Sequence, residues 1–346
     1  SVSQVRSGEP VGKLEPLTLL SAVSALTRHV GLIGTVSTTF TEPYNVARQF
    51  ASLDHLSKGR AGWNIVTSVG GGQNFGPEGL SGHEQRYVRA EEHVQIVKRL
   101  WDSWRDDALV LDKNSGVYAK ADAIRPIGFR GEHFQVEGPL NIPRPPQGRP
   151  VLVQAGASET GRQFAAAHAD VIFTSNQNIG YVQEFYADMK RRVRERGRDP
   201  DHVKILMGAS PVIAPTEAEA FALRNELADL VNYSATIPNL ESVFGGISLA
   251  GLSLDSRIPP ELLPSDSIGG MGQGQYSNYR KLALEEKLTI RELLRVRSMS
   301  RAGHWTPVGS PEQLADQLEA RVNAGACDGF VFNPPYMPQA FELLVN

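Results

Sequence analysis

Short apolar runs alternate with longer amphipathic segments along most of this chain. The short runs are almost continuously apolar, which is typical of strands covered on both faces of a parallel sheet. The segments between them repeat their apolar residues at helical spacing. The runs that predict strands are Gly31–Ser37, Trp63–Thr67, Pro150–Ala155, Asp170–Thr174, Val203–Ala209 and Gly329–Phe332. The repeated strand–helix unit predicts an α/β fold in which helices cover a parallel sheet.

Several predicted helices have recognisable start signals. Thr41 precedes Glu42 and Pro43, so we expect a hydroxyl cap followed by proline in the first turn. Ser310 opens a later helix with a capping-box signature. The other predicted helices are Pro16–Arg28, the helix from Thr41 to about Leu56, His83–Trp104, Glu159–His168, Tyr181–Arg196, Glu217–Leu230 and one near Lys281–Arg297.

The number of predicted strands favours one kind of α/β fold. Six strands are fewer than the eight that close a βα barrel. Because the chain opens with a loop and a helix, we expect a (β/α)8 TIM barrel whose first two strands are absent from this sequence. Residues 1–346 would then form a single barrel domain, with insertions at about 107–149 and 232–300. A complete six-stranded doubly wound sheet is the alternative, but the long insertion before the last strand favours the barrel.

Composition and charge exclude several functions. The 346 residues contain 35 Lys and Arg against 38 Asp and Glu, so no basic excess points to nucleic acid or an anionic membrane. No apolar run is long enough to predict a membrane span. The single cysteine, Cys327, cannot form a disulfide within the chain or a cysteine-based zinc site, and it suits a reducing, cytoplasmic setting. Walker A, G-x-G-x-x-G and G-x-S-x-G motifs are absent from the sequence.

Uncharged polar side chains gather where two predicted strands end. Thr35 and Ser37 lie near the end of one strand, and Asn64 lies in the next. Such groups suit a flat polar heterocycle better than a metal ion, and we predict no metal site. The alternative is that these hydroxyl groups only end strands and cap helices.

Two further segments suit a phosphate group. Gly156, Ala157 and Ser158 join a strand to a helix, and free N–H groups at a helix start bind phosphate. His83 and Tyr87 are four residues apart on a predicted helix, so they share a face and can both donate hydrogen bonds. An ordinary capped turn and a helix-capping histidine are the alternatives.

Three side chains are candidates for the substrate side of a site. Phe40 and Phe75 could line an apolar pocket, and His304 could face a substrate from the irregular region before the last strand. Most aromatic residues pack in a core, and a surface histidine is equally consistent with the sequence.

These residues fall within motifs of a known family. The chain resembles the bacterial luciferase-like, reduced-flavin-dependent monooxygenases, in the branch of nitrilotriacetate monooxygenase component A and dibenzothiophene-sulfone monooxygenase. The similarity covers nearly the whole sequence. It is carried by Glu42–Ser68, Asn74–Gly76, His83-x-x-Arg86-Tyr87, Leu100–Trp104, Gly138–Leu140, Gln154–Ser158 and Ala326–Phe330.

The resemblance implies a βα barrel that binds FMN. By motif, Thr35 would face the flavin ring and Asn64 would lie beside it, with Ser37 at the same strand end. His83 and Tyr87 would bind the phosphate side, and Ala157 with Ser158 would clamp the phosphate.

The resemblance also implies a reaction and its partners. A separate NAD(P)H-dependent reductase would supply FMNH2, and O2 would form a C4a-peroxyflavin that oxygenates a small organic compound, with cleavage of a C–N or C–S bond. No side chain is predicted as an obligate acid or base. Homodimers or tetramers are usual in the family.

Other functions stay open from the sequence. A luciferase-like oxidoreductase could instead transfer hydride with F420 or FMN, a relative could bind flavin without catalysis, and a barrel metal hydrolase is a more distant alternative. The substrate is also open, because polyaminocarboxylates need a basic pocket and aromatic sulfones need an apolar one.

Overall fold

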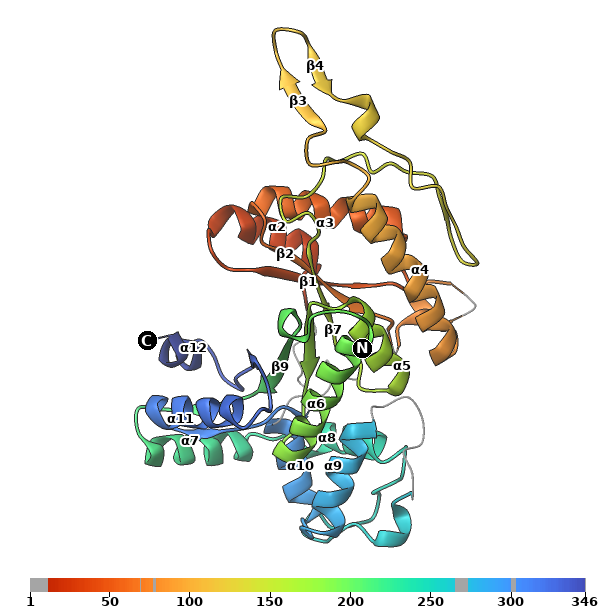
Figure 1. Ribbon diagram of the computed structural model, residues 1–346. Helices are drawn as coiled ribbons and strands as arrows, with labels where there is room; N and C mark the ends of the chain where they lie inside the picture. Colours follow the sequence, from red (N-terminus) through yellow and green to blue (C-terminus); the bar gives the residue numbers. More distant parts are fainter. Residues whose placement is uncertain (1–11, 69, 77–78, 265–272, 300–302, 346) are drawn as a thin grey trace. The chain divides into compact units, whose positions relative to one another are not determined.

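The computed structural model describes residues 12–68, 70–76, 79–264, 273–299 and 303–345. Their contacts divide the chain into two compact units. The amino-terminal unit comprises Lys13–Gly156 and Thr160–Val171, and the carboxyl-terminal unit includes Ala157–Glu159 and the chain from Ile172 onward. Figure 1 shows the elements of both units in sequence colours.

A parallel sheet forms the centre of the amino-terminal unit. Its strands lie in the order β1-β2-β7, and residues directly opposite one another include Thr35 with Asn64 and Asn64 with Val153. The elements of this unit are α2 (Pro16–Leu26), β1 (Leu32–Ser37), α3 (Pro43–Ser57), β2 (Ala61–Val66), α4 (His83–Trp101), β3 (Leu109–Asp112), β4 (Val117–Ala119), β5 (Phe129–Arg130), β6 (Gln135–Val136), β7 (Val151–Gln154) and α5 (Glu159–His168).

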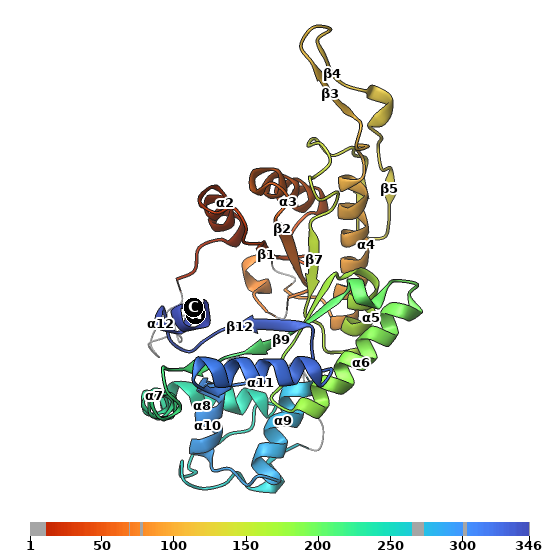
Figure 2. The ribbon, with the colours of Figure 1, turned by 60° about the vertical axis from the view of Figure 1, so that its left-hand side comes forward.

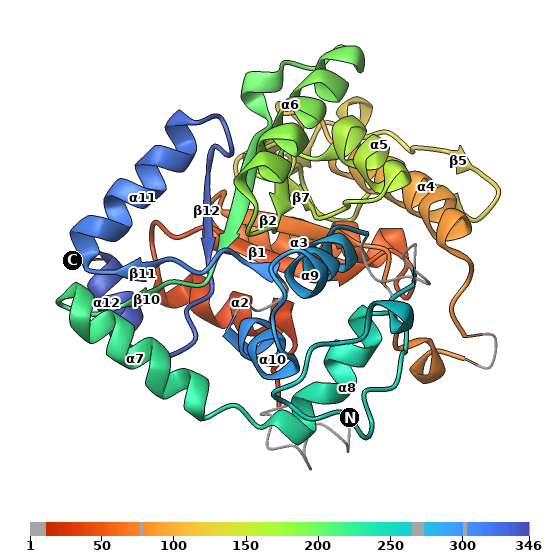
Figure 3. The ribbon, with the colours of Figure 1, turned by 90° about the horizontal axis from the view of Figure 1, so that it is seen from below.

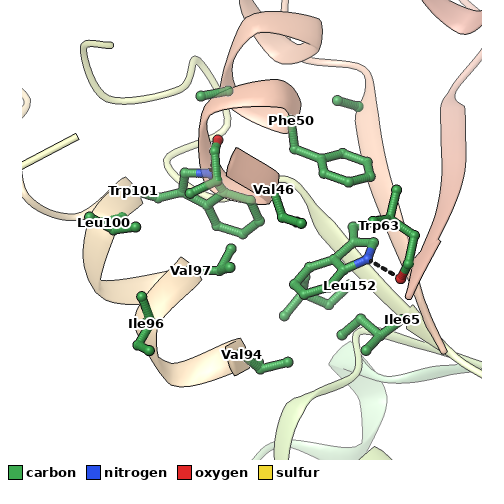
Figure 4. Packing of buried hydrophobic residues seen from close by; sticks show 14 of the residues in the cluster. Val46, Phe50, Trp63, Ile65, Val94, Ile96, Val97, Leu100, Trp101 and Leu152 are labelled. Atoms are coloured by element: carbon green, nitrogen blue, oxygen red, sulfur yellow. Dashed lines mark hydrogen bonds between the residues drawn. The ribbon is translucent and has the colours of Figure 1, made fainter. Parts of the chain in front are cut away.

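One face of this sheet packs against α3 and α4. Burial alternates along β1, so every second side chain enters the core and the others, Thr35 among them, are more exposed. Trp63, Phe50 and Trp101 are fully buried, and Figure 4 shows them packed together. The indole nitrogen of Trp63 donates a 3.0 Å hydrogen bond to the carbonyl of Val36. This packing fixes which face of the strands presents Thr35 and Asn64.

A buried carboxylate ties the end of α3 to β2. Asp54 is fully buried, and one of its oxygens accepts hydrogen bonds from the backbone N–H of Ala61 at 3.1 Å and the side-chain amide of Gln147 at 2.6 Å. The other oxygen accepts the backbone N–H of Gln147 at 3.1 Å. Three donors therefore compensate the burial of this charge.

The first predicted insertion forms two antiparallel hairpins. Strands β3 and β4 pair with each other, as do β5 and β6. Figure 2 shows the β3–β4 hairpin extending beyond α4 and the other helices of its unit.

The carboxyl-terminal unit contains the strand order β8-β9-β12, with β9 and β12 parallel. Asp328 connects its layers, because its carboxylate accepts hydrogen bonds from Tyr186 of α6 at 3.0 Å and from the backbone of Ile205 in β9 at 2.8 Å. The elements are β8 (Val171–Thr174), α6 (Ile179–Glu195), β9 (Lys204–Ala209), β10 (Val212–Ile213), α7 (Glu217–Asp229), α8 (Tyr233–Val243), α9 (Gln273–Leu284), α10 (Ile290–Met299), β11 (Val308–Gly309), α11 (Pro311–Asn323), β12 (Gly329–Phe332) and α12 (Gln339–Val345).

The second predicted insertion is largely helical. Helices α8, α9 and α10 share a hydrophobic cluster that contains the fully buried Phe244, Tyr279 and Leu293. Figure 3 shows α9 and α10 near α8.

Two local predictions were wrong. Thr41 does not cap α3, because its hydroxyl donates to the carbonyl of Ser37 at 2.5 Å, and the capping position is Glu42 without a side-chain bond. The single helix expected near Lys281–Arg297 is two helices. Lys287 has a φ of 56°, and the side chains of Thr289 and Glu292 start a new helix by exchanging hydrogen bonds with the backbone.

None of the helices in the described residues combines the length and apolar character needed to cross a membrane.

Candidate active site

Thr35 and Asn64 form a polar pair on the exposed face of the amino-terminal sheet. They are opposite each other in the β1–β2 register, so both side chains leave the sheet on the same face. The amide nitrogen of Asn64 donates a 3.0 Å hydrogen bond to the hydroxyl of Thr35. The amide oxygen of Asn64 is buried and has no hydrogen-bond donor among the described residues. An orphaned buried acceptor is costly, so this oxygen is suited to a donor on a ligand.

Ser37 lies on the same face at the end of β1. Its hydroxyl is 2.7 Å from the hydroxyl of Ser68 and accepts the backbone N–H of Thr39 at 3.1 Å. The hydroxyl of Thr39 donates to the carbonyl of Thr67 at 2.7 Å. Thr39 thus joins the two strand ends, whereas the hydroxyl of Thr35 is on the exposed face.

His83 and Tyr87 lie together at the start of α4. Their ring centroids are 5.1 Å apart, which confirms that they share a helix face. Tyr87 also makes an edge contact with Phe164 of α5 at 5.6 Å between centroids. The first turn of α4 therefore lies beside the first turns of α5.

A hydrogen bond fixes these two helix starts. The hydroxyl of Thr160 donates to the carboxylate of Glu84 at 2.9 Å, and His83 contacts the same carboxylate at 3.2 Å. The Thr160 hydroxyl, followed by His83, lowers the pKa of Glu84 below its ordinary value. Glu84 is therefore ionised, and its carboxylate orients His83 and Thr160.

The turn between β7 and α5 requires glycine at position 156. The backbone N–H of Gly156 donates to the side chain of Gln154 at 2.7 Å. A Cβ atom at this position would lie 2.7 Å from the Cα of Gly161 in α5, which is too close. Ala157 and Ser158 follow in this turn, just before α5 begins at Glu159, and they are grouped with the carboxyl-terminal unit.

Phe40 and Phe75 stack with nearly parallel rings whose centroids are 4.2 Å apart. They line a pocket of about 620 Å³ within the amino-terminal unit, which we call the Phe40–Arg89 pocket. The pocket is lined by Thr39, Phe40, Phe75, Gly76, Gly79, Ser81, Gln85, Arg86, Val88, Arg89, Glu132 and His133.

His304 belongs to the carboxyl-terminal unit and is buried, so the surface alternative was wrong. Its ring lies against β9, because a Cβ at Gly208 would be 2.7 Å from it. Phe173 of β8 is 5.6 Å away between centroids. Glycine at 208 therefore makes room for this ring.

The charged residues of the Phe40–Arg89 pocket were not predicted from the sequence as site residues. Arg86 and Arg89 are three residues apart on α4, a spacing that places them on one face and could have identified them. Glu132 and His133 come from the β5–β6 hairpin, and no local pattern links them to α4. The described residues contain no cluster of three or more His, Cys, Asp or Glu side chains that could hold a metal ion.

Parallel strands joined by helices, with polar side chains on the strands, are the arrangement of an α/β enzyme. A family described as luciferase-like monooxygenase matches residues 2–327 of this sequence. The chain therefore belongs to the luciferase-like monooxygenase family, as its motifs predicted.

Two curated relatives and one solved structure are similar over almost the whole chain. N-acetyl-S-(2-succino)cysteine monooxygenase of Bacillus subtilis is 44% identical over 336 residues, which cover 96% of this chain and 75% of that protein. Nitrilotriacetate monooxygenase component A of Aminobacter aminovorans is 42% identical over 348 residues, which cover 100% of this chain and 76% of that protein. The crystal structure of the riboflavin lyase RcaE with modified FMN and riboflavin has a TM-score of 0.83 and 31% identity, and the match covers 99% of this chain and 75% of that one.

Membership of this family distinguishes between the alternative folds and the alternative reactions that the sequence left open. The fold is of the TIM-barrel type found in luciferase-like monooxygenases, not a doubly wound sheet. The chain is a flavin-dependent enzyme that uses O2, and oxygenation is supported over hydride transfer.

Proposed function

We propose that this chain is the oxygenating component of a two-component system. It would receive reduced FMN from a separate NAD(P)H-dependent reductase and use O2 to oxygenate a small organic substrate, with cleavage of a C–N or C–S bond. The name of the Aminobacter relative, a component A, supports the two-component arrangement. The names of both relatives identify substrates with a carbon–nitrogen or carbon–sulfur bond at the centre.

The exposed strand face suits the flavin ring. The buried amide oxygen of Asn64 lacks a donor among the described residues, and an isoalloxazine carries a ring N–H that can supply one. Thr35 and Ser37 add hydroxyl groups on the same face. None of the three is charged, so this face can hold either redox state of the ring.

We place the phosphate at the starts of α4 and α5. His83 and Tyr87 would donate hydrogen bonds, and Ala157 and Ser158 would contribute backbone N–H groups and a hydroxyl. The close approach of Gly156 to α5 supports this assignment, because it brings the backbone of the turn to the positive end of the helix.

When bound, reduced FMN would supply the electrons that activate O2. The protein would hold the ring, exclude water and orient the substrate. No side chain among Thr35, Ser37 and Asn64 can act as an acid near neutral pH. We therefore propose that their role is positioning, and no obligate catalytic acid or base is assigned.

The proposed partners suggest where in the cell the enzyme works. A cytoplasmic location would provide both the reductase and NAD(P)H, and it suits the buried free thiol of Cys327. We also propose a homodimer or tetramer that associates through barrel helices.

The observation that carries the proposal is the Thr35–Asn64 pair in a chain that matches the family across residues 2–327. Turnover under ¹⁸O2 with reductase-supplied FMNH2 and a panel of amines and thioethers tests it. We expect one labelled oxygen atom in the oxidised product. Product that forms without label, or only with reduced F420, would contradict the proposal.

A further inference from the structure

We infer that the Phe40–Arg89 pocket binds the carboxylate groups of an organic substrate whose apolar part lies on Phe75. The inference rests on the proposed function, because it assigns part of the substrate of that reaction.

The pocket contains two guanidinium groups with spare donors. Among the described residues, the Arg86 side chain donates one hydrogen bond, from its Nη1 to the carbonyl of Ser81. The carboxylate that pairs with Arg89 is that of Glu42, whose oxygen is 3.8 Å from Nη2. A guanidinium has five N–H donors, and carboxylate oxygens are acceptors that match its planar fork. Most donors of both side chains are therefore left for a ligand.

Packing holds Arg89 in place. Its guanidinium carbon lies 4.2 Å from the centre of the Phe134 ring, and its side chain is only 26% exposed. The Nε atoms of both arginines are buried without a hydrogen bond in the described structure. A guanidinium that is already fixed loses less conformational entropy on binding an anion.

The charge of the pocket lining favours an anion. Arg86 and Arg89 are opposed by the carboxylate of Glu132, and His133 adds an imidazole. Glu132 is exposed, and Glu92 holds its loop by accepting the backbone N–H groups of Glu132 at 2.8 Å and His133 at 3.0 Å. Among the described residues of the lining, both arginines thus come from a helix, and the one carboxylate comes from a hairpin loop.

The aromatic wall favours an organic occupant over a simple inorganic anion. Phe75 is 64% exposed while it stacks on Phe40, so one large apolar surface faces the solvent. An inorganic anion would leave this surface uncovered, whereas an organic body would bury it. The volume, about 620 Å³, is in the range of small-molecule sites.

The pocket is connected to the proposed flavin face. Thr39 lines the pocket, and its backbone N–H donates to the hydroxyl of Ser37 at the end of β1. A ligand anchored by Arg86 and Arg89 would therefore lie next to the strand end that carries Thr35 and Ser37.

Isothermal titration with two matched thioethers, (benzylthio)succinate and its dimethyl ester, tests the inference. We expect the dicarboxylate to bind the full chain at least about tenfold more tightly than the ester, both with and without oxidised FMN. Arg86→Gln with Arg89→Gln should lower dicarboxylate affinity about tenfold or more, whereas Arg89→Lys should retain more of it because it keeps the charge.

A second pair of variants avoids the risk that the arginine variants fail to fold. Glu132→Gln should strengthen dicarboxylate binding about two- to fivefold, because it removes the opposing charge. Glu137→Gln changes the net charge equally, comes from the same exposed segment and does not line the pocket, so it should change nothing.

The outcomes separate this inference from the proposed function. Equal affinity for acid and ester, no binding of the dicarboxylate under either condition, or equal effects of Glu132→Gln and Glu137→Gln would overturn the inference. FMN affinity is measured in the same samples. If the wild-type protein does not bind FMN, the proposed function is wrong. Its affinity for the dicarboxylate still tests the inference about the Phe40–Arg89 pocket.

Discussion

The hydroxyl of Thr160, in the first turn of α5, donates a 2.9 Å hydrogen bond to the carboxylate of Glu84, in the first turn of α4. His83, which we assign to the phosphate, contacts the same carboxylate. The bond between Thr160 and Glu84 therefore positions His83, the proposed phosphate donor, although neither Thr160 nor Glu84 is assigned to the phosphate itself.

Replacing Thr160 with valine should weaken FMN binding about three- to tenfold, because His83 and α5 lose their common anchor. Riboflavin, which lacks the phosphate, should bind the variant and the wild type equally. The bond is exposed, so the free energy of unfolding should change little. Fluorescence titration with both flavins checks this, and an equal loss for riboflavin would refute the positioning role.

Gly156→Ala should displace the start of α5, because the new Cβ would lie 2.7 Å from the Cα of Gly161. We expect FMN affinity to fall about tenfold or more, since the phosphate site depends on this turn. Gly70→Ala is the matched control, because a Cβ at position 70 would have no atom within 4 Å. Wild-type affinity in Gly156→Ala would show that the turn does not bind phosphate.

The sequence was sufficient to predict most elements of the fold. The strand runs at Leu32–Ser37 and Val171–Thr174 were found within one residue at each end, because parallel strands are apolar throughout. The capping box at Ser310 was also confirmed. The cap at Thr41 was mispredicted because a nearby carbonyl, that of Ser37, competes for the same hydroxyl.

The site was less predictable for a physical reason. The pairing of Thr35 with Asn64 depends on strand register. Arg89 and His133 line the same pocket only because a hairpin distant in the sequence folds back on α4. Neither relationship is a local pattern. The spacing of His83 and Tyr87 was local, and the structure brings their rings together as predicted.

Buried His93 should make the protein less stable in mild acid. Burial, followed by the charge of Arg89, lowers the pKa of His93 from 6.5 to about 3. The unfolded state therefore binds more protons than the folded state between those values, so the free energy of unfolding falls as pH drops through this window. From pH 6.5 to 5 we expect a loss of about 2 kcal/mol from this residue.

Urea unfolding at several pH values measures the effect. His93→Phe keeps an aromatic ring between Trp63 and Phe134 and should remove this part of the pH dependence. His202→Gln is the control, because that histidine is 86% exposed and should leave the dependence in place. An identical pH profile for wild type and His93→Phe would contradict the assignment.

Asp54→Ala should destabilise the amino-terminal unit. The change leaves the N–H groups of Ala61 and Gln147 without their acceptor in a buried place, at a cost of about 3 kcal/mol. Asp122→Ala, a substitution of an exposed aspartate, should cost less than about 0.5 kcal/mol. Chemical denaturation of the three proteins provides the comparison, and equal stability of Asp54→Ala and wild type would show that these bonds contribute nothing.

Anaerobic titration of the wild-type chain and Asn64→Leu with reduced FMN shows whether the Thr35–Asn64 pair holds the flavin. We expect one FMN per wild-type chain and binding at least about tenfold weaker in Asn64→Leu, because the buried amide is lost. Asn114→Leu, in the exposed β3–β4 turn, should bind like the wild type. Equal affinity in all three proteins, or no binding of reduced FMN by the wild type, would contradict this expectation.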